Sequence, residues 1–323
     1  MTRRARILHH GRCFDGAVSA ALLIRLLRRV TPADTFETVG QAHRPGSPYD
    51  ERSFTATWNA VVDFRYSSDP ALTWWFDHHA STFSCAEDRR HFESDRSGQK
   101  FFDPEAPSCA GLIHQVARSR LNLELTPSDP ELIEWADTID AARFPDASTA
   151  VGLRAPALQL MTWLEVAATE GDEARLIAEL ADAVAIPDLV SRTYVTAGLQ
   201  PALDRHRQNI ALVRSRMEID GGVAFVDLMD AAPGAVSKFI PYDADPDVIY
   251  TVMVLRTKTS IKISVGSNPW APERRQHDIA ALCQRFGGGG HAAVGAISLD
   301  PHQDKKAYEI AFLIASILRE QLP

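Results

Sequence analysis

The chain has 323 residues, of which 45% are hydrophobic, and a formal net charge of −8. This length can bury a sizeable core, and at about 100–200 residues per domain it favours two domains. No apolar stretch approaches the roughly 20 residues of a membrane span, so a cytoplasmic protein with no membrane contact is expected. The acidic charge argues against binding of duplex nucleic acid, which requires many Lys and Arg residues. The four cysteines are scattered without a CxxC pair, which argues against a disulfide framework and a structural zinc site.

Short apolar runs alternate with helical patterns over the first 140 residues. The pattern predicts strands at 4–10, 35–43, 58–64 and 71–79, and helices at 15–30, 108–121 and 130–142. Strands separated by helices indicate βαβ units, and therefore a parallel sheet. Three of these strands end in ionisable side chains. Because ligands bind at the carboxyl ends of parallel strands, we expect these groups to line one crevice.

The remainder of the chain changes character twice. Residues 153–217 carry apolar residues at helical spacings. After Gly221 and Gly222, strands are predicted at 223–229, 247–256, 260–267 and 291–299, helices at 277–286 and 307–322, and a tight loop at 287–290. The expected architecture is α/β, with a parallel-sheet domain over 1–190, a connector helix over 191–219 and a smaller α/β domain with a mixed sheet over 220–323.

The polar residues that follow the predicted strands are of the types that bind divalent cations. Carboxylate and imidazole ligands suit ions that activate water for phosphoryl chemistry, and two such ions require a bridging carboxylate. Individually these residues have simpler explanations: Asp15 fits a helix cap, and His78 and His79 could be loop histidines. The combination favours a site, because a core has no reason to collect so many polar groups. The candidates in chain order are His9, Asp15, Asp63, Asp77, His78, His79 and a later aspartate.

Two motifs resemble those of the DHH phosphoesterases. "FDHH" at 76–79 matches the motif that gives this superfamily its name, and "FGGGGHAAVGA" at 286–296 resembles the Gly-rich motif of the DHH-associated domain. Both stand in the expected order, and together the resemblance covers nearly the whole chain. Members include RecJ exonucleases, nano-RNases, cyclic-dinucleotide phosphodiesterases, and the related pyrophosphatases and exopolyphosphatases.

The resemblance implies a two-metal site for Mn²⁺, with Mg²⁺ or Co²⁺ as alternatives. The first motif, in "HHGRCFDG", places Cys13 where the family has an aspartate. A thiolate prefers softer ions than a carboxylate does, so Cys13 is either an altered ligand or a small buried residue. In the last motif Asp137 fits best and Asp140 is the fallback. The implied ligands are His9, Cys13, Asp15, Asp63, His78 and Asp137 or Asp140, while His79 faces the substrate phosphate and Asp77 orients the histidine pair.

The Gly-rich loop is the expected substrate-binding element. Backbone N–H groups of Gly287, Gly288, Gly289 and Gly290 could form an anion cradle, with His291 and Arg256 as further contacts. The alternative is a plain flexible turn. Nano-RNases tend to carry an arginine in the strand before this loop, but this chain has Gly266 in "SVGS" there.

The predicted function is metal-dependent hydrolysis of short single-stranded oligonucleotides or small nucleotide phosphoesters, with a homodimer as a candidate assembly. The predicted chemistry is in-line attack by water that two metal ions activate. Two alternatives stay open: a catalytically weakened nucleotide-binding protein that lost one metal through Cys13, and a phosphoanhydride hydrolase of the pyrophosphatase or polyphosphatase type. Editing of mischarged tRNA is not expected, since no synthetase-like segment is present.

Overall fold

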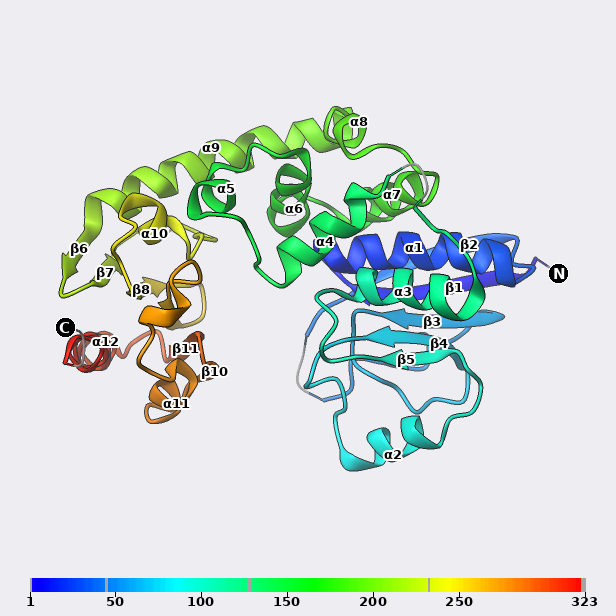
Figure 1. The fold of residues 1–323 in the computed structure, drawn as a ribbon, viewed down its shortest axis with the longest axis horizontal. Coiled ribbons are helices and arrows are strands. Elements are labelled where there is room, and N and C mark those ends of the chain that lie inside the picture. The colour runs from blue at the N-terminus through cyan, green and yellow to red at the C-terminus, as the bar shows by residue number, and fades with distance from the viewer. Residues whose placement is uncertain (1, 44–45, 127–128, 232, 321–323) are drawn as a thin grey trace. The chain divides into compact units, whose positions relative to one another are not determined.

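The chain forms two compact units in the computed structural model, which describes residues 2–43, 46–126, 129–231 and 233–320. The N-terminal unit comprises Met1–Phe144 and Arg154–Ala202, and the C-terminal unit comprises Pro145–Leu153 and Leu203–Pro323 (Figure 1). The domain limits expected from the sequence stay a proposal, and the end of the predicted last helix, residues 321–322, falls outside the described residues. Among those residues, every helix is too short or too polar to cross a bilayer.

The N-terminal unit is built on a five-stranded parallel sheet, as predicted. Its strand order is β2-β1-β3-β4-β5, and every neighbouring pair is parallel. Each strand from β1 to β4 lies within a segment where the apolar pattern predicts one. The strands are β1 (Arg4–His10), β2 (Thr35–Gln41), β3 (Trp58–Val62), β4 (Leu72–Asp77) and β5 (Lys100–Phe102).

Helix α1 (Phe14–Val30) is the central helix of this unit. All its residues from Phe14 to Leu27 are buried, including the polar residues Asp15, Ser19 and Arg25, as expected of a helix that lies in the interior and is mostly apolar. Among the described residues, four helices contact it: α3 (Cys109–Leu121), α4 (Glu131–Asp140), α7 (Glu170–Ala181) and, less extensively, α6 (Pro156–Val166). The helical segment continues with α8 (Ile186–Val190) and α9 (Thr193–Arg216).

The other face of the parallel sheet carries a cluster of aromatic and aliphatic side chains. Leu8, Val61 and Trp75 are neighbours in register across β1, β3 and β4, and Phe64 packs with them. Helix α2 (Ala86–Ser94) contributes Phe92 to this cluster and lies below the sheet in Figure 1. Neither α2 nor β5 is predicted from the sequence. The sequence of α2, AEDRRHFES, has no apolar period because none of its residues is fully buried.

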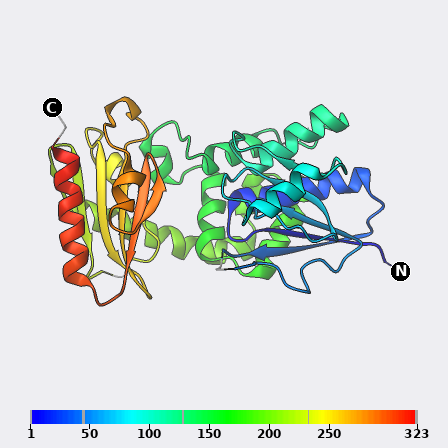
Figure 2. The same ribbon diagram turned by 90° about the horizontal axis from the view of Figure 1, so that it is seen from below.

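The C-terminal unit contains a six-stranded sheet of order β10-β11-β9-β8-β7-β6. Only β7 and β8 pair in parallel, so the sheet is mixed, as predicted. Helices α11 (Ile279–Gln284) and α12 (Asp304–Arg319) share one core cluster with the sheet, and Figure 2 shows α12 along one side of the strands. Helices α5 (Ala147–Gly152), α9 and α10 (Ile240–Ala244) pack on the other face. The strands are β6 (Met217–Asp220), β7 (Val223–Leu228), β8 (Tyr250–Arg256), β9 (Ile261–Ser267), β10 (Gly289–His291) and β11 (Val294–Leu299), and a 3₁₀ turn spans Pro272–Arg274.

The prediction of one tight loop at 287–290 followed by one strand at 291–299 is wrong. Gly289 and Gly290 belong to β10, which forms a short hairpin with β11. A Cβ atom on Gly290 would lie 2.2 Å from the carbonyl oxygen of Val294, and one on Gly288 would lie 2.3 Å from that of Ala296. Gly288 and Gly290 are therefore required by close packing of two backbone segments.

Candidate metal centre

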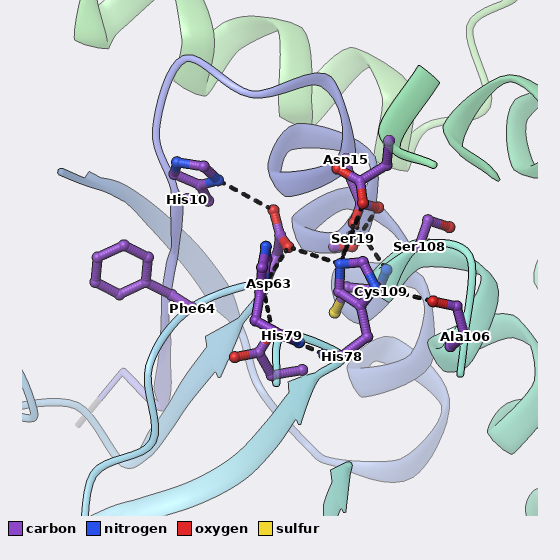
Figure 3. A network of polar contacts seen from close by, with 12 residues as sticks. His10, Asp15, Ser19, Asp63, Phe64, His78, His79, Ala106, Ser108 and Cys109 are labelled. Atoms are coloured by element: carbon purple, nitrogen blue, oxygen red, sulfur yellow. Dashed lines mark hydrogen bonds and ion pairs between the residues drawn. The ribbon is translucent and has the colours of Figure 1, made fainter. Parts of the chain in front are cut away.

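Three neighbouring strands bring ionisable side chains together at the carboxyl edge of the parallel sheet. His10 ends β1, Asp77 ends β4, and Asp63 follows β3 directly. The Asp63 N–H donates to the carbonyl oxygen of Phe76 at 3.0 Å, which holds Asp63 beside the end of β4. Figure 3 shows Asp63 between His10 on one side and His78 on the other. The convergence that the sequence predicts is therefore present.

Asp63 lies at the centre of this group. Its side chain is fully buried, yet neither carboxylate oxygen has a hydrogen-bond partner among the described residues. Imidazole nitrogens surround it at ion-pair distances: His10 Nδ1 at 3.5 Å, His78 Nε2 at 3.7 Å and His79 Nδ1 at 3.7 Å. Burial opposes ionisation of Asp63, but these imidazoles outweigh it and lower its pKa to about 2. Asp63 is therefore ionised, and positive charge beside it stabilises the ionised form.

His78 is oriented by a backbone contact. Its Nδ1–H donates to the carbonyl oxygen of Ala106 at 2.9 Å, so Nε2 faces three carboxylates: Asp140 at 3.3 Å, Asp63 at 3.7 Å and Asp15 at 3.8 Å. Burial would lower its pKa, but the carboxylates raise it to about 10. A backbone acceptor on the second nitrogen is the usual arrangement of a metal-binding histidine, because it fixes the ring and the tautomer.

Asp15 joins two helices. Its carboxylate accepts hydrogen bonds from the N–H groups of Cys109 at 2.7 Å and Ala110 at 2.9 Å, at the start of α3, and from Ser19 Oγ at 3.2 Å. Burial, together with the charges of Asp63 and Asp140, raises its pKa well above the ordinary value. Asp15 thus has the capping role of the simpler interpretation, but for α3 rather than for its own helix. It also faces His78.

Asp77 holds the histidine pair in place. Its Oδ1 accepts from the N–H of His78 at 2.8 Å and from His79 Nδ1 at 2.8 Å, and its Oδ2 accepts from Thr82 Oγ1. The hydrogen bond to Asp77 raises the pKa of His79. The His79 side chain is half-exposed. Because its Nδ1 is hydrogen-bonded to Asp77, the other ring nitrogen, Nε2, is the one that could contact a ligand.

The described residues form three overlapping groups that could hold a metal ion. Within each group the ligand atoms lie within 4.8 Å of one another. The buried oxygens of Asp63 and Nε2 of His78 lack hydrogen-bond partners, and an unpaired buried polar atom is costly unless something binds it. The residues therefore fit a divalent cation of the oxygen- and nitrogen-binding kind. The groups are Asp63–Asp77–His78–His79, His10–Cys13–Asp63 and Asp15–His78–Asp140.

The first motif is placed differently from the expectation. His10, not His9, lies with Cys13 and Asp63. The His9 ring is buried on the other side of the strand, where its Nδ1 lies 3.9 Å from Glu173 Oε1. Adjacent strand residues point to opposite faces, so the two histidines approach the site from different sides of the sheet. The geometry adds His10 as a candidate ligand. His9 is outside the three groups of described residues but lies close enough to Asp63 for an electrostatic interaction, so it stays a proposed ligand.

Cys13 and the last aspartate stay candidate ligands. Burial and the nearby carboxylates of Asp63 and Asp15 raise the pKa of the Cys13 thiol well above its ordinary value, so the thiol is protonated until a cation displaces the proton. Asp140 is in direct reach of His78. Asp137, the better match by sequence context, instead accepts a hydrogen bond from Ser108 Oγ at 2.5 Å and belongs to none of the three groups.

Of the residues in the C-terminal unit that are proposed to contact the substrate, some have a structural role and others do not. Arg256 donates to the carbonyl oxygen of Pro301 at 2.5 Å and to Asp304 Oδ2 at 2.7 Å, so its guanidinium already stabilises the start of α12. Gly287 has φ 79° and follows α11. A Cβ atom on Gly289 would meet nothing within 4 Å, and His291 is exposed. Packing therefore does not explain Gly289 and His291.

Several residues of the site are not identified by the sequence analysis. His10 is one of the ionisable residues that end the predicted strands, but its neighbour His9 is the ligand expected from the sequence. Glu173 is buried and accepts from the N–H of Arg12 at 2.8 Å, 161 residues earlier. Thr82 contacts the positioning residue Asp77, and Ser19 contacts the candidate ligand Asp15, each through a single hydroxyl group. Nothing in their local sequence distinguishes these last three, because each acts through a contact made by folding.

Comparison with known proteins finds similarity in structure alone. No family model matches the chain, and no curated protein matches it. A pGpG-specific phosphodiesterase, PggH from Vibrio cholerae, superposes with a TM-score of 0.69 and 16% identity over 98% of this chain and 99% of that one. The DHH domain of a member of a family of ribosomal proteins gives 0.60 and 14% over 98% and 88%. An exonuclease RecJ bound to manganese gives 0.52 and 16% over 98% and 90%.

These similarities identify the fold. All three neighbours cover almost the whole chain, and they include a DHH domain and RecJ. The resemblance to the DHH phosphoesterases is confirmed at the level of fold.

Proposed function

We propose that this protein is a metal-dependent phosphoesterase that hydrolyses phosphodiester bonds in short single-stranded oligonucleotides or small nucleotides. The observation that carries the proposal is a pair of buried groups, the Asp63 carboxylate and His78 Nε2, where three candidate ligand groups meet. They lie 3.7 Å apart as an ion pair, but neither has a hydrogen-bond partner among the described residues. Buried polar groups usually have hydrogen bonds, and a bound cation would supply the missing contacts.

The site residues divide into those that would hold two ions and those that would contact the substrate. Asp63 is common to two groups and is the candidate bridging ligand. Asp15, His78 and Asp140 would complete one site, and His10 and Cys13 the other. Divalent ions bound there would activate water near neutral pH and neutralise charge on the phosphoryl oxygens. Manganese is the proposed ion, with magnesium or cobalt as alternatives, and RecJ neighbours are described with Mn²⁺ and with Mg²⁺.

His79 is the proposed catalytic side chain outside the ligand set. Its Nδ1–H is held by Asp77 Oδ1 at 2.8 Å, which fixes the ring and leaves Nε2 to donate to a phosphoryl or leaving-group oxygen. Asp77 itself contacts no substrate in this scheme. It is a positioning residue, and its second oxygen is held by Thr82.

The substrate class rests on two observations. Two of the neighbours are a pGpG-specific phosphodiesterase and an exonuclease, and the chain has a C-terminal unit with a Gly-rich hairpin that we propose binds the substrate through Gly287, Gly288, Gly289, Gly290 and His291. An exopolyphosphatase-related protein is also a neighbour, with a TM-score of 0.50 and 13% identity, so hydrolysis of phosphoanhydrides is the alternative. The expected homodimer and cytoplasmic location stay predictions.

A nucleotide-binding protein without catalysis is the second candidate. The observation that favours it is Cys13, whose half-buried thiol has a raised pKa and would bind a hard cation poorly. In that case one ion would be missing while the substrate still binds. The collection of buried and half-buried polar groups at the strand ends favours the enzyme.

The test is turnover of a substrate panel with manganese and with chelator. The panel contains a 5′-labelled RNA dinucleotide, a longer RNA, a cyclic dinucleotide and pyrophosphate. We expect manganese-dependent cleavage of the dinucleotide. Cleavage of pyrophosphate alone would support the phosphoanhydride alternative, and ligand binding without cleavage in calorimetry would support the binding protein.

Substitution of the central carboxylate connects this activity to the site. Asp63→Asn is expected to reduce turnover by more than the roughly 10–100-fold that loss of an outer-shell partner costs, with circular dichroism unchanged. The matched control is Asp188→Asn, because Asp188 is exposed on α8. Equal turnover in Asp63→Asn and the control would contradict the two-metal scheme.

A further inference from the structure

An exposed imidazole lies beside the candidate ligands without belonging to them. His43 follows β2 in the loop at the carboxyl edge of the sheet. Its ring centroid is 4.9 Å from that of His10, in an edge-on arrangement at 65°. His43 thus contacts His10, which itself contacts Asp63.

One face of the His43 ring packs against the buried side chain of Phe64. It stacks on Phe64 with a centroid distance of 4.9 Å and an interplanar angle of 30°. Phe64 is 1% exposed, and Tyr49 packs edge-on against it with centroids 6.4 Å apart. One face of the imidazole is therefore used in packing, while the residue as a whole is exposed to solvent. Among the described residues, the ring contacts of His43 are this stack on Phe64 and the edge-on contact with His10, so the second face is the one on which a ligand could stack.

The position of this ring relative to Asp63 indicates which part of a ligand it would meet. His10 and Phe64 lie on one side of Asp63, and Asp15 and His78 lie on the opposite side (Figure 3). A phosphoryl group bound at the carboxylates would have its attached nucleoside about one side-chain length away. Flat aromatic side chains, histidine included, bind nucleobases by stacking.

We propose that the free face of His43 is a stacking subsite for the nucleobase adjoining the scissile phosphate, a proposal that rests on the nucleotide substrate argued above. The subsite selects for an aromatic ring next to the phosphate and not for a particular base, since stacking does not depend on hydrogen bonding to the base edge. It also distinguishes nucleotide substrates from pyrophosphate, which has no ring.

The test compares His43→Ala with His43→Phe on a linear RNA dinucleotide and on pyrophosphate. A base–aromatic stack corresponds to about 5–150-fold in affinity. We expect His43→Ala to raise the KM for the dinucleotide about tenfold while changing kcat little, and His43→Phe to restore the KM. His302→Ala is the matched control, because His302 is also exposed but lies in the C-terminal unit. Unchanged KM in His43→Ala, or no rescue by Phe, would overturn the subsite.

A binding measurement separates this proposal from the proposed function. A dinucleotide containing 2-aminopurine loses fluorescence when its base stacks, whether or not it is cleaved. If the wild-type protein has no hydrolase activity but quenches the probe, and His43→Ala does not, the function fails and the subsite stands. If the wild-type protein cleaves the dinucleotide but quenching is equal in His43→Ala, the subsite fails and the function stands. Absence of quenching by the wild-type protein overturns the subsite.

Discussion

Asp63 combines three features that rarely occur together in one residue. It is fully buried, its oxygens lack hydrogen-bond partners among the described residues, and its backbone has φ 54°. A left-handed conformation is uncommon outside glycine and costs roughly 1–3 kcal/mol unless the surroundings impose it. The N–H of Asp63 donates to the carbonyl oxygen of Phe76 in this conformation. The geometry turns the side chain out of the strand and into the cluster of histidines.

The thiol of Cys13 determines the expected metal preference. If Cys13 is a ligand, Cys13→Asp exchanges a soft ligand for a hard one and is expected to raise activity with Mg²⁺ relative to activity with Mn²⁺ or Zn²⁺. The measurement is a metal titration of turnover for the two proteins, with Cys85→Asp as control, since Cys85 is exposed and distant in sequence. Identical metal profiles in Cys13→Asp and wild-type protein would show that Cys13 is not a ligand.

Glu173 contacts the turn between His10, which ends β1, and Cys13. It accepts the N–H of Arg12, whose backbone has φ 58°, and lies beside His9. Burial lowers the pKa of His9. Glu173→Ala leaves the Arg12 N–H unpaired, so we expect a loss of about 1–3 kcal/mol in the free energy of unfolding and weaker metal binding. Glu173→Gln keeps an acceptor and is expected to recover most of both.

Denaturant unfolding and metal titration by calorimetry measure these two effects. Glu170→Ala is the control, because Glu170 is exposed in the same helical turn. If Glu173→Ala unfolds as the control does and binds metal as the wild-type protein does, Glu173 does not position the loop.

At the scale of elements, the hairpin of β10 and β11 contains one glycine that packing requires, Gly288, and one that it does not, Gly289. Gly288→Ala places a Cβ atom against the backbone of β11 and is expected to destabilise the C-terminal unit by about 1–3 kcal/mol. Gly289→Ala meets no atom and is expected to change stability by less than about 0.5 kcal/mol. Thermal unfolding of the two variants tests this difference. Equal destabilisation by both substitutions would contradict the packing account.

The strand ends explain how much of the site the sequence could predict. Asp63, Asp77, His78 and His79 are recognisable because each follows an apolar strand, and the order of the strands in the sheet then brings them together. Which of His9 and His10 faces Asp63 depends on the direction of one side chain at the end of β1, and residue order does not give it. Asp140 and Asp137 lie three residues apart on α4, where helix rotation alone decides which reaches His78.

At the scale of the whole molecule, most strands of the two sheets and several of the helices that cover them were predictable, while β5 and α2 were not. Apolar runs mark the strands of both units, and the parallel and mixed pairings follow the predicted pattern. Helix α2 was missed because it covers an aromatic cluster with a polar sequence and one partly buried ring, Phe92. Residues 145–153 belong to the C-terminal unit although they precede α6 of the N-terminal unit. No change in composition marks where the chain passes from one unit to the other.

Anomalous diffraction from crystals grown with manganese is the measurement that tests the metal centre most directly. We predict anomalous density within about 2.0–2.6 Å of an Asp63 carboxylate oxygen, with a position also bound by His78 Nε2. A second position bound by His10 would complete the two-metal site. Saturating manganese with no anomalous density at Asp63 would contradict the assignment of this cluster as a metal centre.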